Sequence, residues 1–431
     1  MELINNFLWS IATVLLILSG LYFSFKLKFI HLNIFKIFKS LKGNKNKEGI
    51  TPFQSLSVSL GGCIGVGSLA GIALAIFKGG VGTIFWIITS CFIIAPNSIV
   101  ENALAVMYHE KTKNGYIGGP SFYIKKGLGF KKVSLLYAIV VCIAYLFGFL
   151  TIQSNTIAAS ITTFYNIPSF VIGIIIGILS FIIIKKGIKG IAKFSSMFVP
   201  IMSLVYLIVS LFIIVKNINI IPNIIFNIIH EAFNTTSLKY GILSSIIIGL
   251  ERGIFASEVG TGTSAIASGS SNLKHPIQQG LVGVIGVYFT TFVICLSTSL
   301  IILTSNYNPN MYNAVNGIEI TLNSLTYHLG SFGNIILYFS LIAFSFSTII
   351  SGYYYVETNL KFIFNNLSEK YTLFLKLFTC LLLFLAPIIN PEFIWNISDL
   401  LVAILIIINV ISILNLKKDV IMELEVGGQY E

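Results

Sequence analysis

The sequence predicts an all-α integral membrane protein in which one extra N-terminal helix precedes a 5+5 inverted repeat, giving eleven transmembrane helices. Three observations predict this fold: an apolar composition, eleven apolar runs of spanning length, and glycine-rich interruptions in the second and seventh runs. Of the 431 residues, 55% are hydrophobic and 10% are charged, whereas soluble domains carry about 25% charged residues. Soluble cores do not bury so much apolar surface, so the bilayer is the expected solvent.

The net charge of +11 does not indicate nucleic-acid binding, because the lysines form short clusters between apolar runs, as in cytoplasmic loops. The five cysteines lie inside apolar runs without the spacing of a metal site or a disulfide framework, and we interpret them as small buried side chains. We therefore expect no nucleic-acid partner, no bound cofactor and no required protein partner. The cysteines are Cys63, Cys91, Cys142, Cys295 and Cys380.

Each predicted span approaches the roughly 20 apolar residues that cross a bilayer. The first is interpreted as a retained helix rather than a signal peptide, because Glu2 precedes the apolar run and no small-x-small cleavage site follows it. The spans are residues 6–26, 53–77, 82–108, 133–157, 167–184, 193–215, 241–271, 277–303, 332–358, 372–389 and 394–415.

The lysines orient these spans. When the loops alternate sides, 23 lysines fall on one side and only Lys78, Lys216 and Lys239 on the other, so the rich side is cytoplasmic, the N-terminus outside and the C-terminus inside a cell membrane. We expect 109–132 along the inner membrane face, and 217–238 and 310–330 as outer, lid-like segments. The predicted parts are an N-terminal helix with a basic inner loop (1–50), a first five-helix repeat (51–216), an outer segment (217–240), a second repeat (241–415) and a cytoplasmic tail (416–431).

Two spans carry glycines where a membrane helix is usually most regular, at residues 61–71 and 257–264. Close helix packing through small residues four apart explains part of the pattern. The alternative is an unwound segment that presents backbone groups to a solute. The pair favours the second explanation, because each span opens a block of five helices and an odd number inverts the second block. Paired broken helices of this kind indicate a midplane binding site in a transporter.

Broken helices suit an amino acid and a cation. A half-helix N-terminus attracts a carboxylate, and freed carbonyls coordinate an ion such as sodium. Ser347 and Thr348 in the ninth span would add hydroxyl oxygens to such a cage, although hydroxyls in membrane helices usually bond to their own backbone. Gln153, Ser154 and Asn155 form a polar cluster that is costly unless it lines a cavity.

Ionisable residues inside spans are presumed functional. Arg252 is the sole arginine of the sequence, and it is expected to pair at a gate with Glu258 or Glu357, or alternatively to lock two helices together. The predicted intramembrane ions are Glu101, Glu251, Arg252, Glu258, Glu357 and Asp399.

These motifs resemble the alanine or glycine:cation symporter family of the amino acid-polyamine-organocation superfamily. The resemblance runs in order from about residue 50 to 415, through 65–71, 115–126 and 153–155, and is most specific in 251–283. It includes Arg-Gly-Ile-Phe-Ala-Ser-Glu-Val-Gly at 252–260 and His-Pro-Ile-Gln-Gln-Gly-Leu-Val-Gly at 275–283. Further matches are Ser347-Thr348, residues 354–357, Asp399 and Asn409.

The resemblance implies a leucine-transporter-type fold with an amino acid and a sodium ion at the first broken helix. The implied substrate-binding residues are Gly65, Val66, Gly67, Ser68, Gln153, Phe255, Ser257 and Gly352. The implied sodium ligands are Gly61, Ile64, Phe344, Ser347 and Thr348, and the gating residues are Arg252 and Glu258.

Three positions depart from the family. Val66-Gly67-Ser68 stands where the family usually has Thr-Gly-Asn, which removes one hydroxyl and one amide. Gly352 replaces a frequent tryptophan and is expected to enlarge the pocket. Thr290 replaces an aspartate, which leaves a second cation site and the contact with the ammonium group open.

The sequence therefore predicts a secondary symporter that imports a small neutral amino acid with sodium by alternating access. A proton-coupled carrier, a carrier of larger amino acids and an ion channel are the alternatives. The sequence contains no phosphate-binding loop for a primary pump. It also lacks the paired aspartates or serine–histidine pair expected of an intramembrane enzyme.

Overall fold

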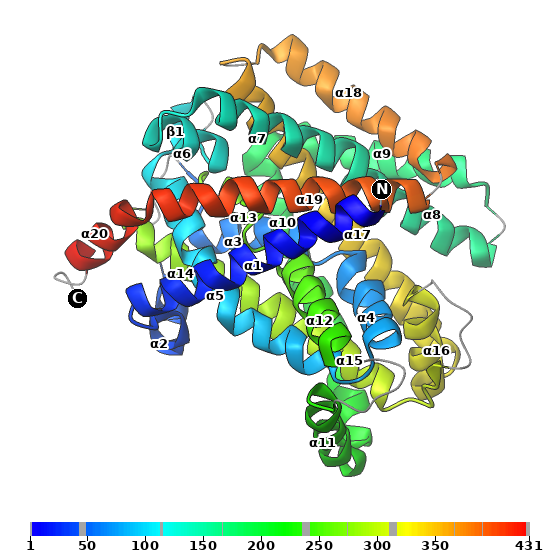
Figure 1. The fold of residues 1–431 in the computed structure, drawn as a ribbon. Helices are drawn as coiled ribbons and strands as arrows, with labels where there is room; N and C mark the ends of the chain where they lie inside the picture. Colours follow the sequence, from blue (N-terminus) through cyan, green and yellow to red (C-terminus); the bar gives the residue numbers. More distant parts are fainter. Residues whose placement is uncertain are drawn as a thin grey trace.

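The computed structural model describes residues 2–42, 49–112, 115–165, 167–234, 242–273, 275–309, 317–365, 367–389 and 391–427. These residues form helices apart from one short hairpin (Figure 1). Several predicted inner or outer residues, including Lys45, Lys47, Lys113, Lys239 and Lys274, lie outside the described residues, as do parts of the segments 217–238 and 310–330 and of the tail 416–431.

The α-helices are α1 (Glu2–Lys26), α2 (Ile34–Lys39), α3 (Pro52–Cys63), α4 (Ile72–Gly79), α5 (Thr83–Met107), α6 (Pro120–Gly127), α7 (Lys131–Ile143), α8 (Leu150–Tyr165), α9 (Ser169–Ile184), α10 (Gly187–Lys216), α11 (Ile221–Ala232), α12 (Ile242–Ser257), α13 (Thr263–Ser268), α14 (Pro276–Val287), α15 (Leu296–Leu303), α16 (Gly317–Leu329), α17 (Ser331–Ile363), α18 (Glu369–Leu385), α19 (Pro391–Asn415) and α20 (Lys417–Gly427). Wider π-turns form η2 (Gly67–Gly71), η3 (Ala144–Phe149) and η5 (Tyr288–Cys295). Short 3₁₀ turns form η1 (Ile30–Leu32), η4 (Ile218–Ile220) and η7 (Ala386–Ile388).

Eight helical stretches among the described residues are long and apolar enough to cross a membrane, and a ninth results if α3 and the stretch Gly67–Gly79 count as one span bent by 58°. The eight are Ile4–Lys26, Thr83–Met107, Lys131–Thr162, Gly187–Lys216, Pro276–Leu303, Ser331–Ile363, Glu369–Ile388 and Ile394–Asn415. All nine coincide with predicted spans.

Two predicted spans correspond to shorter helices. Residues 167–184 contain α9, which has 16 residues. Residues 241–271 contain α12, also of 16 residues, and the six-residue α13. The total of eleven spans and the inverted relation of the two blocks therefore stay predictions.

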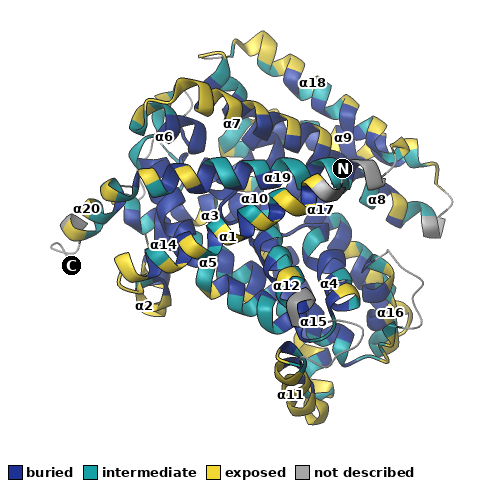
Figure 2. Cartoon of the chain, in the orientation of Figure 1, coloured by how far each residue is buried: buried dark blue, intermediate teal, exposed yellow. Residues whose placement is uncertain are grey.

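Helix α17 forms the centre of the protein. Nearly every residue from Phe344 to Asn359 is buried, whereas the outward faces of helices such as α9, α10 and α18 carry exposed leucine, isoleucine and phenylalanine side chains (Figure 2). Tyr353, Tyr354 and Tyr355 are all buried and pack inside the protein. A polar core under an apolar exterior is the arrangement that a bilayer requires.

The segment 109–132 contains both a hairpin and a helix. Glu110–Thr112 (β1) and Gly115–Ile117 (β2) form an antiparallel hairpin that the sequence did not predict. Phe122 and Tyr123 of α6 are buried where α6 packs on α5 and α7, and the placement of the segment along the inner membrane face stays a prediction. The glycines around α6 permit this depth: a Cβ at Gly119 would lie 2.8 Å from Ile266 Cγ1, and its φ is +123°.

The connecting segments lie at two ends of the molecule. In Figure 1, α2, α6 and α20 lie toward the left, whereas α11 and α16 lie toward the bottom and right. We name the end with α2 and α20 the inner side and the other the outer side, following the orientation that the lysines predict. Helix α16, in the predicted outer segment 310–330, packs against η2 and α4.

Candidate functional site

The first broken helix begins with strong local signals and then loses its regular backbone. Thr51 and Gln54 form a capping box at the start of α3, and Pro52 occupies the first helical position. The helix ends at Cys63, and Ile64 leaves the helical conformation at φ −81° and ψ 88°. The chain resumes as the π-turn η2 at Gly67. The first amide groups of a helix have no partner within it, so those of Val66 and Gly67 can be presented to a carboxylate, whereas the Ser68 amide donates to the Gly65 carbonyl at 3.2 Å.

Five oxygen atoms lie close together at this break. They belong to the residues that the resemblance implies as sodium ligands. Thr348 Oγ1 lies 3.0 Å from the Gly61 carbonyl oxygen and 3.5 Å from that of Ile64. Ser347 Oγ lies 3.2 Å from the Gly61 oxygen, and both hydroxyls also reach the Phe344 carbonyl. Hard cations prefer oxygen ligands of this kind. The cage joins α3 to α17, two helices that are nearly 300 residues apart in the chain.

Gln153 and Phe255 lie against the unwound glycines. A Cβ at Gly65 would lie 3.0 Å from Thr348 Oγ1 and 3.1 Å from Gln153 Nε2, and a Cβ at Gly67 would lie 3.2 Å from the Phe255 ring. Gln153 Oε1 is buried without a hydrogen-bond partner among the described residues, and so is the hydroxyl of Ser68. The break thus combines backbone amides, two unpaired polar side chains and an aromatic cover.

The other members of the Gln153 cluster have a different role. Ser154 Oγ donates to the Leu383 carbonyl at 2.7 Å, and Asn155 Nδ2 donates to the carbonyls of Ala386 and Ile389. These two residues therefore fasten α8 to the end of α18 and η7. Only Gln153 faces the broken helix.

Three further predicted positions differ from their expected surroundings. The expectation that Gly352 enlarges the pocket is wrong, because a Cβ there would lie 2.6 Å from Leu150 Cδ1 and 2.8 Å from Tyr145 Cδ1. Ser257 Oγ donates back to carbonyls of its own helix, so its carbonyl, 3.6 Å from Cys63 Sγ, is the group directed at the break. Thr290 Oγ1 likewise bonds to the carbonyls one turn before it. The neighbouring side chains fill the space at Gly352.

The second broken helix is interrupted by backbone that favours glycine. Gly260 and Gly262 have φ values of +80° and +81°, and Glu258 has φ +52°, a conformation that costs a non-glycine residue about 1–2 kcal/mol. Interactions of its carboxylate hold Glu258 there: Thr263 Oγ1 donates at 2.7 Å and Tyr145 Oη at 3.1 Å. The segment therefore folds around a buried acid.

A small cavity of about 10 Å³ lies beside Glu258 and the Phe255 ring. Its volume suits about one water molecule, so an amino acid at Gly65–Gly67 requires Phe255 or its neighbours to move. Phe255 stacks on Phe149 with 6.1 Å between ring centroids. It contacts other rings and the Arg252 guanidinium, so its displacement breaks no hydrogen bond.

Below the second break lies a network of hydrogen bonds that the sequence did not predict. Asn409 Nδ2 donates to Glu101 Oε2 and to the Gly260 carbonyl, both at 2.9 Å. Asn409 Oδ1 accepts from the Tyr123 hydroxyl, and Ser264 Oγ donates to Glu101 Oε1 at 3.2 Å. Glu101 is fully buried. The positions were visible as intramembrane polar residues, but nothing local indicated their pairing.

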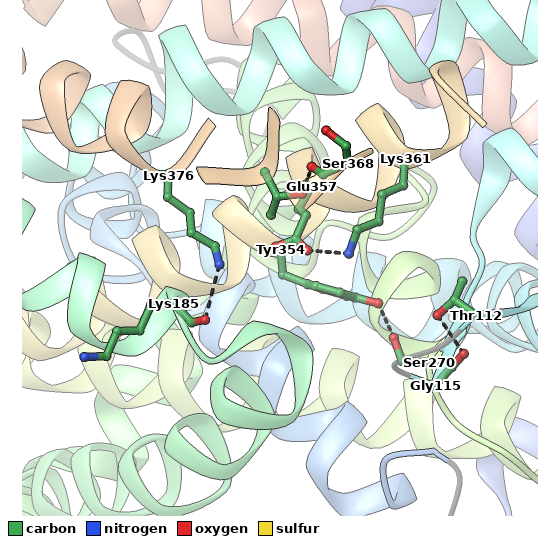
Figure 3. Close-up of polar contacts among 10 residues, drawn as sticks. Thr112, Gly115, Lys185, Ser270, Tyr354, Glu357, Lys361, Ser368 and Lys376 are labelled. Atoms are coloured by element: carbon green, nitrogen blue, oxygen red, sulfur yellow. Dashed lines mark hydrogen bonds and ion pairs between the residues drawn. The ribbon is translucent and has the colours of Figure 1, made fainter. Parts of the chain in front are cut away.

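Two tyrosines add further hydrogen bonds to the second broken helix toward the inner side. The Tyr137 hydroxyl donates to the Thr261 carbonyl at 2.6 Å, and Tyr354 bonds to Ser270 (Figure 3). The same view shows Glu357 paired with Lys361 one turn further along α17. The inner half of the second broken helix is thus held by hydrogen bonds to α5, α7, α17 and α19.

Arg252 lies on the outer side of the same break, away from both carboxylates proposed as its partners. The prediction of a pair with Glu258 or Glu357 is wrong, because Glu258 binds Thr263 and Tyr145 and Glu357 binds Lys361. Arg252 instead lies 5.7 Å above the Phe255 ring. It lines a cavity of about 80 Å³ with Asn6, Trp9, Glu251, Phe255 and Asp399.

The charges in this outer cavity act on one another. Arg252 interacts electrostatically with Glu251 and Asp399, and Asp399 Oδ1 is buried without a hydrogen-bond partner among the described residues. Asp399 comes from α19 and Asn6 from α1. Arg252 therefore connects the outer half of the broken helix to two helices outside it.

Comparisons with known proteins place these features in context. A family model described as the sodium:alanine symporter family matches residues 1–430. The chain is 33% identical over 429 residues to the probable sodium/glutamine symporter GlnT of Bacillus subtilis (strain 168), covering 98% of this chain and 88% of that protein. It is 34% identical over 438 residues to the putative sodium/proton-dependent alanine carrier protein YrbD of the same organism, covering 98% and 90%.

Solved structures resemble the chain in fold. MhsT in complex with L-phenylalanine matches with a TM-score of 0.62 and 11% identity, over 85% of this chain and 89% of that one. A Na⁺-coupled sialic acid symporter in a substrate-bound outward-open state matches with a TM-score of 0.55 and 14% identity, over 96% and 82%. Both are transporters of leucine-transporter-type fold.

Proposed function

Because the chain belongs to the sodium:alanine symporter family, and is therefore a multi-pass, sodium-coupled amino-acid symporter rather than an enzyme, we propose that it imports a small neutral amino acid of the alanine or glycine type. The observation that carries the proposal is the oxygen cage of Gly61, Ile64, Phe344, Ser347 and Thr348 directly beside Gly65 and Gly67. A sodium ion held in this cage would lie next to the amides of the break.

The amino acid binds with its carboxylate toward Val66, Gly67 and Ser68, where the start of η2 supplies amides and positive dipole. Gln153 contributes a polar contact from α8, and Phe255 covers the site. Sodium in the neighbouring cage adds positive charge near the carboxylate. Each ligand therefore strengthens the binding of the other.

Transport then requires the two sides of the second break to open in turn. On the outer side Phe255 withdraws from Gly67, with Arg252 and Asp399 as the gate beside it. On the inner side the bonds from Tyr137 and Asn409 to the break separate. Because sodium bridges α3 and α17, its release frees these helices to part.

The proposal includes the arrangement in the membrane. The N-terminus lies outside and the C-terminus in the cytoplasm, and residues 51–216 and 241–415 form the two five-helix repeats. The two helix breaks near the head of each block support this organisation. Cysteine accessibility from each side, probed at positions 2 and 425, tests it: labelling of position 425 from outside intact cells contradicts the orientation.

Counterflow in proteoliposomes tests the function. We expect labelled alanine or glycine to exchange in the presence of sodium and not with a proton gradient alone. The double variant Ser347→Ala/Thr348→Val should raise the half-saturating sodium concentration about tenfold or more, equivalent to ~1.4 kcal/mol of binding. Ser345→Ala is the matched control, because Ser345 Oγ has no partner among the described residues. Sodium-independent exchange in the wild type contradicts the proposal.

A larger or proton-coupled substrate is the second candidate. Val66 and Ser68 are smaller or less polar than the residues usual in the family, and relatives carry names that include glutamine and sodium/proton-dependent alanine transport. Glutamine and a proton gradient therefore belong in the same counterflow assay. Exchange of glutamine in preference to alanine favours this candidate.

A further inference from the structure

A cavity on the inner side of the protein lies outside the proposed transport machinery. It has a volume of about 590 Å³ and lies between the end of α1, the start of α2 and α20. Lys26, Lys28 and Lys36 line it together with the apolar side chains of Phe29, Ile421 and Leu424. Its size is that of a small-molecule site.

The charge of this cavity is positive. The three lysines face one acid, Glu425. His31 lies in the same turn, but burial lowers its pKa to about 4, so the histidine is neutral. The lysines alone supply the positive charge that an anionic ligand requires.

The backbone is built to bring the lysines here. Lys28 and Phe29 are consecutive residues with φ values of +51° and +55°, and the left-handed conformation costs each about 1–2 kcal/mol. It turns the chain sharply away from α1 into η1 and α2. Asn33 then accepts a hydrogen bond from the amide of Lys36 at the start of α2. Strain of this kind persists where surrounding structure requires it.

The surroundings are those of a membrane interface. Helix α1 crosses the apolar layer and ends at Lys26, and α20 follows directly after the span of α19. Helix α2 is largely exposed beside the cavity (Figure 2), with Phe35 at 91% and Phe38 at 58%. An exposed helix with phenylalanine and lysine side chains at the end of a span is typical of an element lying in the interface.

From this combination of lysines, apolar walls and position, we propose that the cavity binds an anionic glycerophospholipid. The lysine ammonium groups bind its phosphate, and Phe29, Ile421 and Leu424 contact the first part of its acyl chains. Basic pockets at the ends of spans recognise anionic headgroups in this way. The lipid would join α2 to α20, which also packs on α5 and α14.

Lipid retention measured by native mass spectrometry tests the site. Detergent-purified protein is titrated with phosphatidylglycerol or with phosphatidylcholine of the same acyl chains. We expect phosphatidylglycerol to bind ten- to hundredfold more tightly, because each lysine near an anionic group contributes about fivefold. Equal retention of the two lipids overturns the proposal.

Lysine variants test whether the preference for phosphatidylglycerol arises in this cavity. Lys26→Gln/Lys28→Gln/Lys36→Gln should abolish the preference, whereas Lys131→Gln/Lys132→Gln/Lys189→Gln, which removes the same charge from exposed lysines elsewhere, should keep it. If the triple variant does not fold, Lys28→Gln alone should weaken binding about fivefold. Glu425→Gln should strengthen it by a similar factor, since it removes the negative charge.

A last arm distinguishes lipid from soluble phosphate. Inorganic phosphate and glycerol phosphate carry the same anionic group without acyl chains. We expect neither to displace phosphatidylglycerol at millimolar concentration. Displacement by either would make this a site for a soluble phosphate compound and overturn the lipid assignment, as would an unchanged preference in the triple variant.

Discussion

The outer and inner sides of the second broken helix are closed by different chemistry. On the outer side, Phe255 covers Gly67 through ring contacts, and Arg252 shares a cavity of about 80 Å³ with Asp399. On the inner side, hydrogen bonds from Tyr137 and Asn409 reach backbone carbonyls of the break, and Glu101 is held within the same network.

The difference has a physical consequence. Stacked rings can separate without leaving hydrogen-bonding groups unpaired, whereas each buried hydrogen bond that opens leaves groups that need new partners. The outer side is therefore expected to open at lower cost than the inner side. Substitutions on the outer side should affect transport, and those on the inner side should first affect stability.

The largest effect is expected at Gly67. Valine there would push directly against the Phe255 ring, which lies 3.2 Å from the position of a Cβ, and should reduce transport more than about 100-fold while membrane insertion is retained. Gly71→Ala is the control, since a Cβ there meets nothing within 4 Å. Counterflow measures the loss. Transport by Gly67→Val would show that the amino acid binds elsewhere.

Asn409→Leu tests the inner side. The change removes one donor from Glu101 and from the Gly260 carbonyl and the acceptor of Tyr123, so the protein should lose ~3 kcal/mol of stability. Thermal unfolding in detergent measures the loss. Asn415→Leu in the same helix should change little, because Asn415 bonds only to its own turn. Equal melting of both variants would contradict the inner network.

Arg252→Gln tests the outer side, and it should reduce transport more than stability. The change removes the positive charge that lines the cavity beside Glu251 and Asp399, and transport should fall about tenfold, ~1.4 kcal/mol, with a smaller change in melting than for Asn409→Leu. Arg252→Lys separates charge from stacking on Phe255. If Lys restores transport fully, the charge alone matters.

The smallest effect distinguishes bonded from unbonded tyrosines. Tyr137→Phe removes the hydroxyl that donates to Thr261 and should cost about 1 kcal/mol. Tyr355→Phe should cost nothing or stabilise slightly, because the Tyr355 hydroxyl is buried without a hydrogen-bond partner among the described residues. Unfolding in detergent compares the two. The same cost for both would mean that the Tyr137 bond adds nothing to the inner closure.

Much of the fold could be predicted because its signals are local. Apolar runs indicated nine spans that the described helices match, and glycine clusters located both breaks. The short α9 and the interrupted α12–α13 pair fall below the length that identifies a span by itself. The β1–β2 hairpin was missed because three-residue strands carry almost no periodicity.

The candidate site likewise has parts that the sequence predicted and parts that it did not. The sequence by itself determined where the helices break, because glycine content is a property of single segments, and the family resemblance implied which oxygens lie at the first break. The tertiary structure alone decided that Arg252 shares its cavity with Asp399, that Leu150 and Tyr145 fill the space at Gly352, and that Asn409 closes the inner side. Those contacts join residues from about 150 to more than 200 positions apart, and no local pattern of amino acids encodes which distant side chains meet.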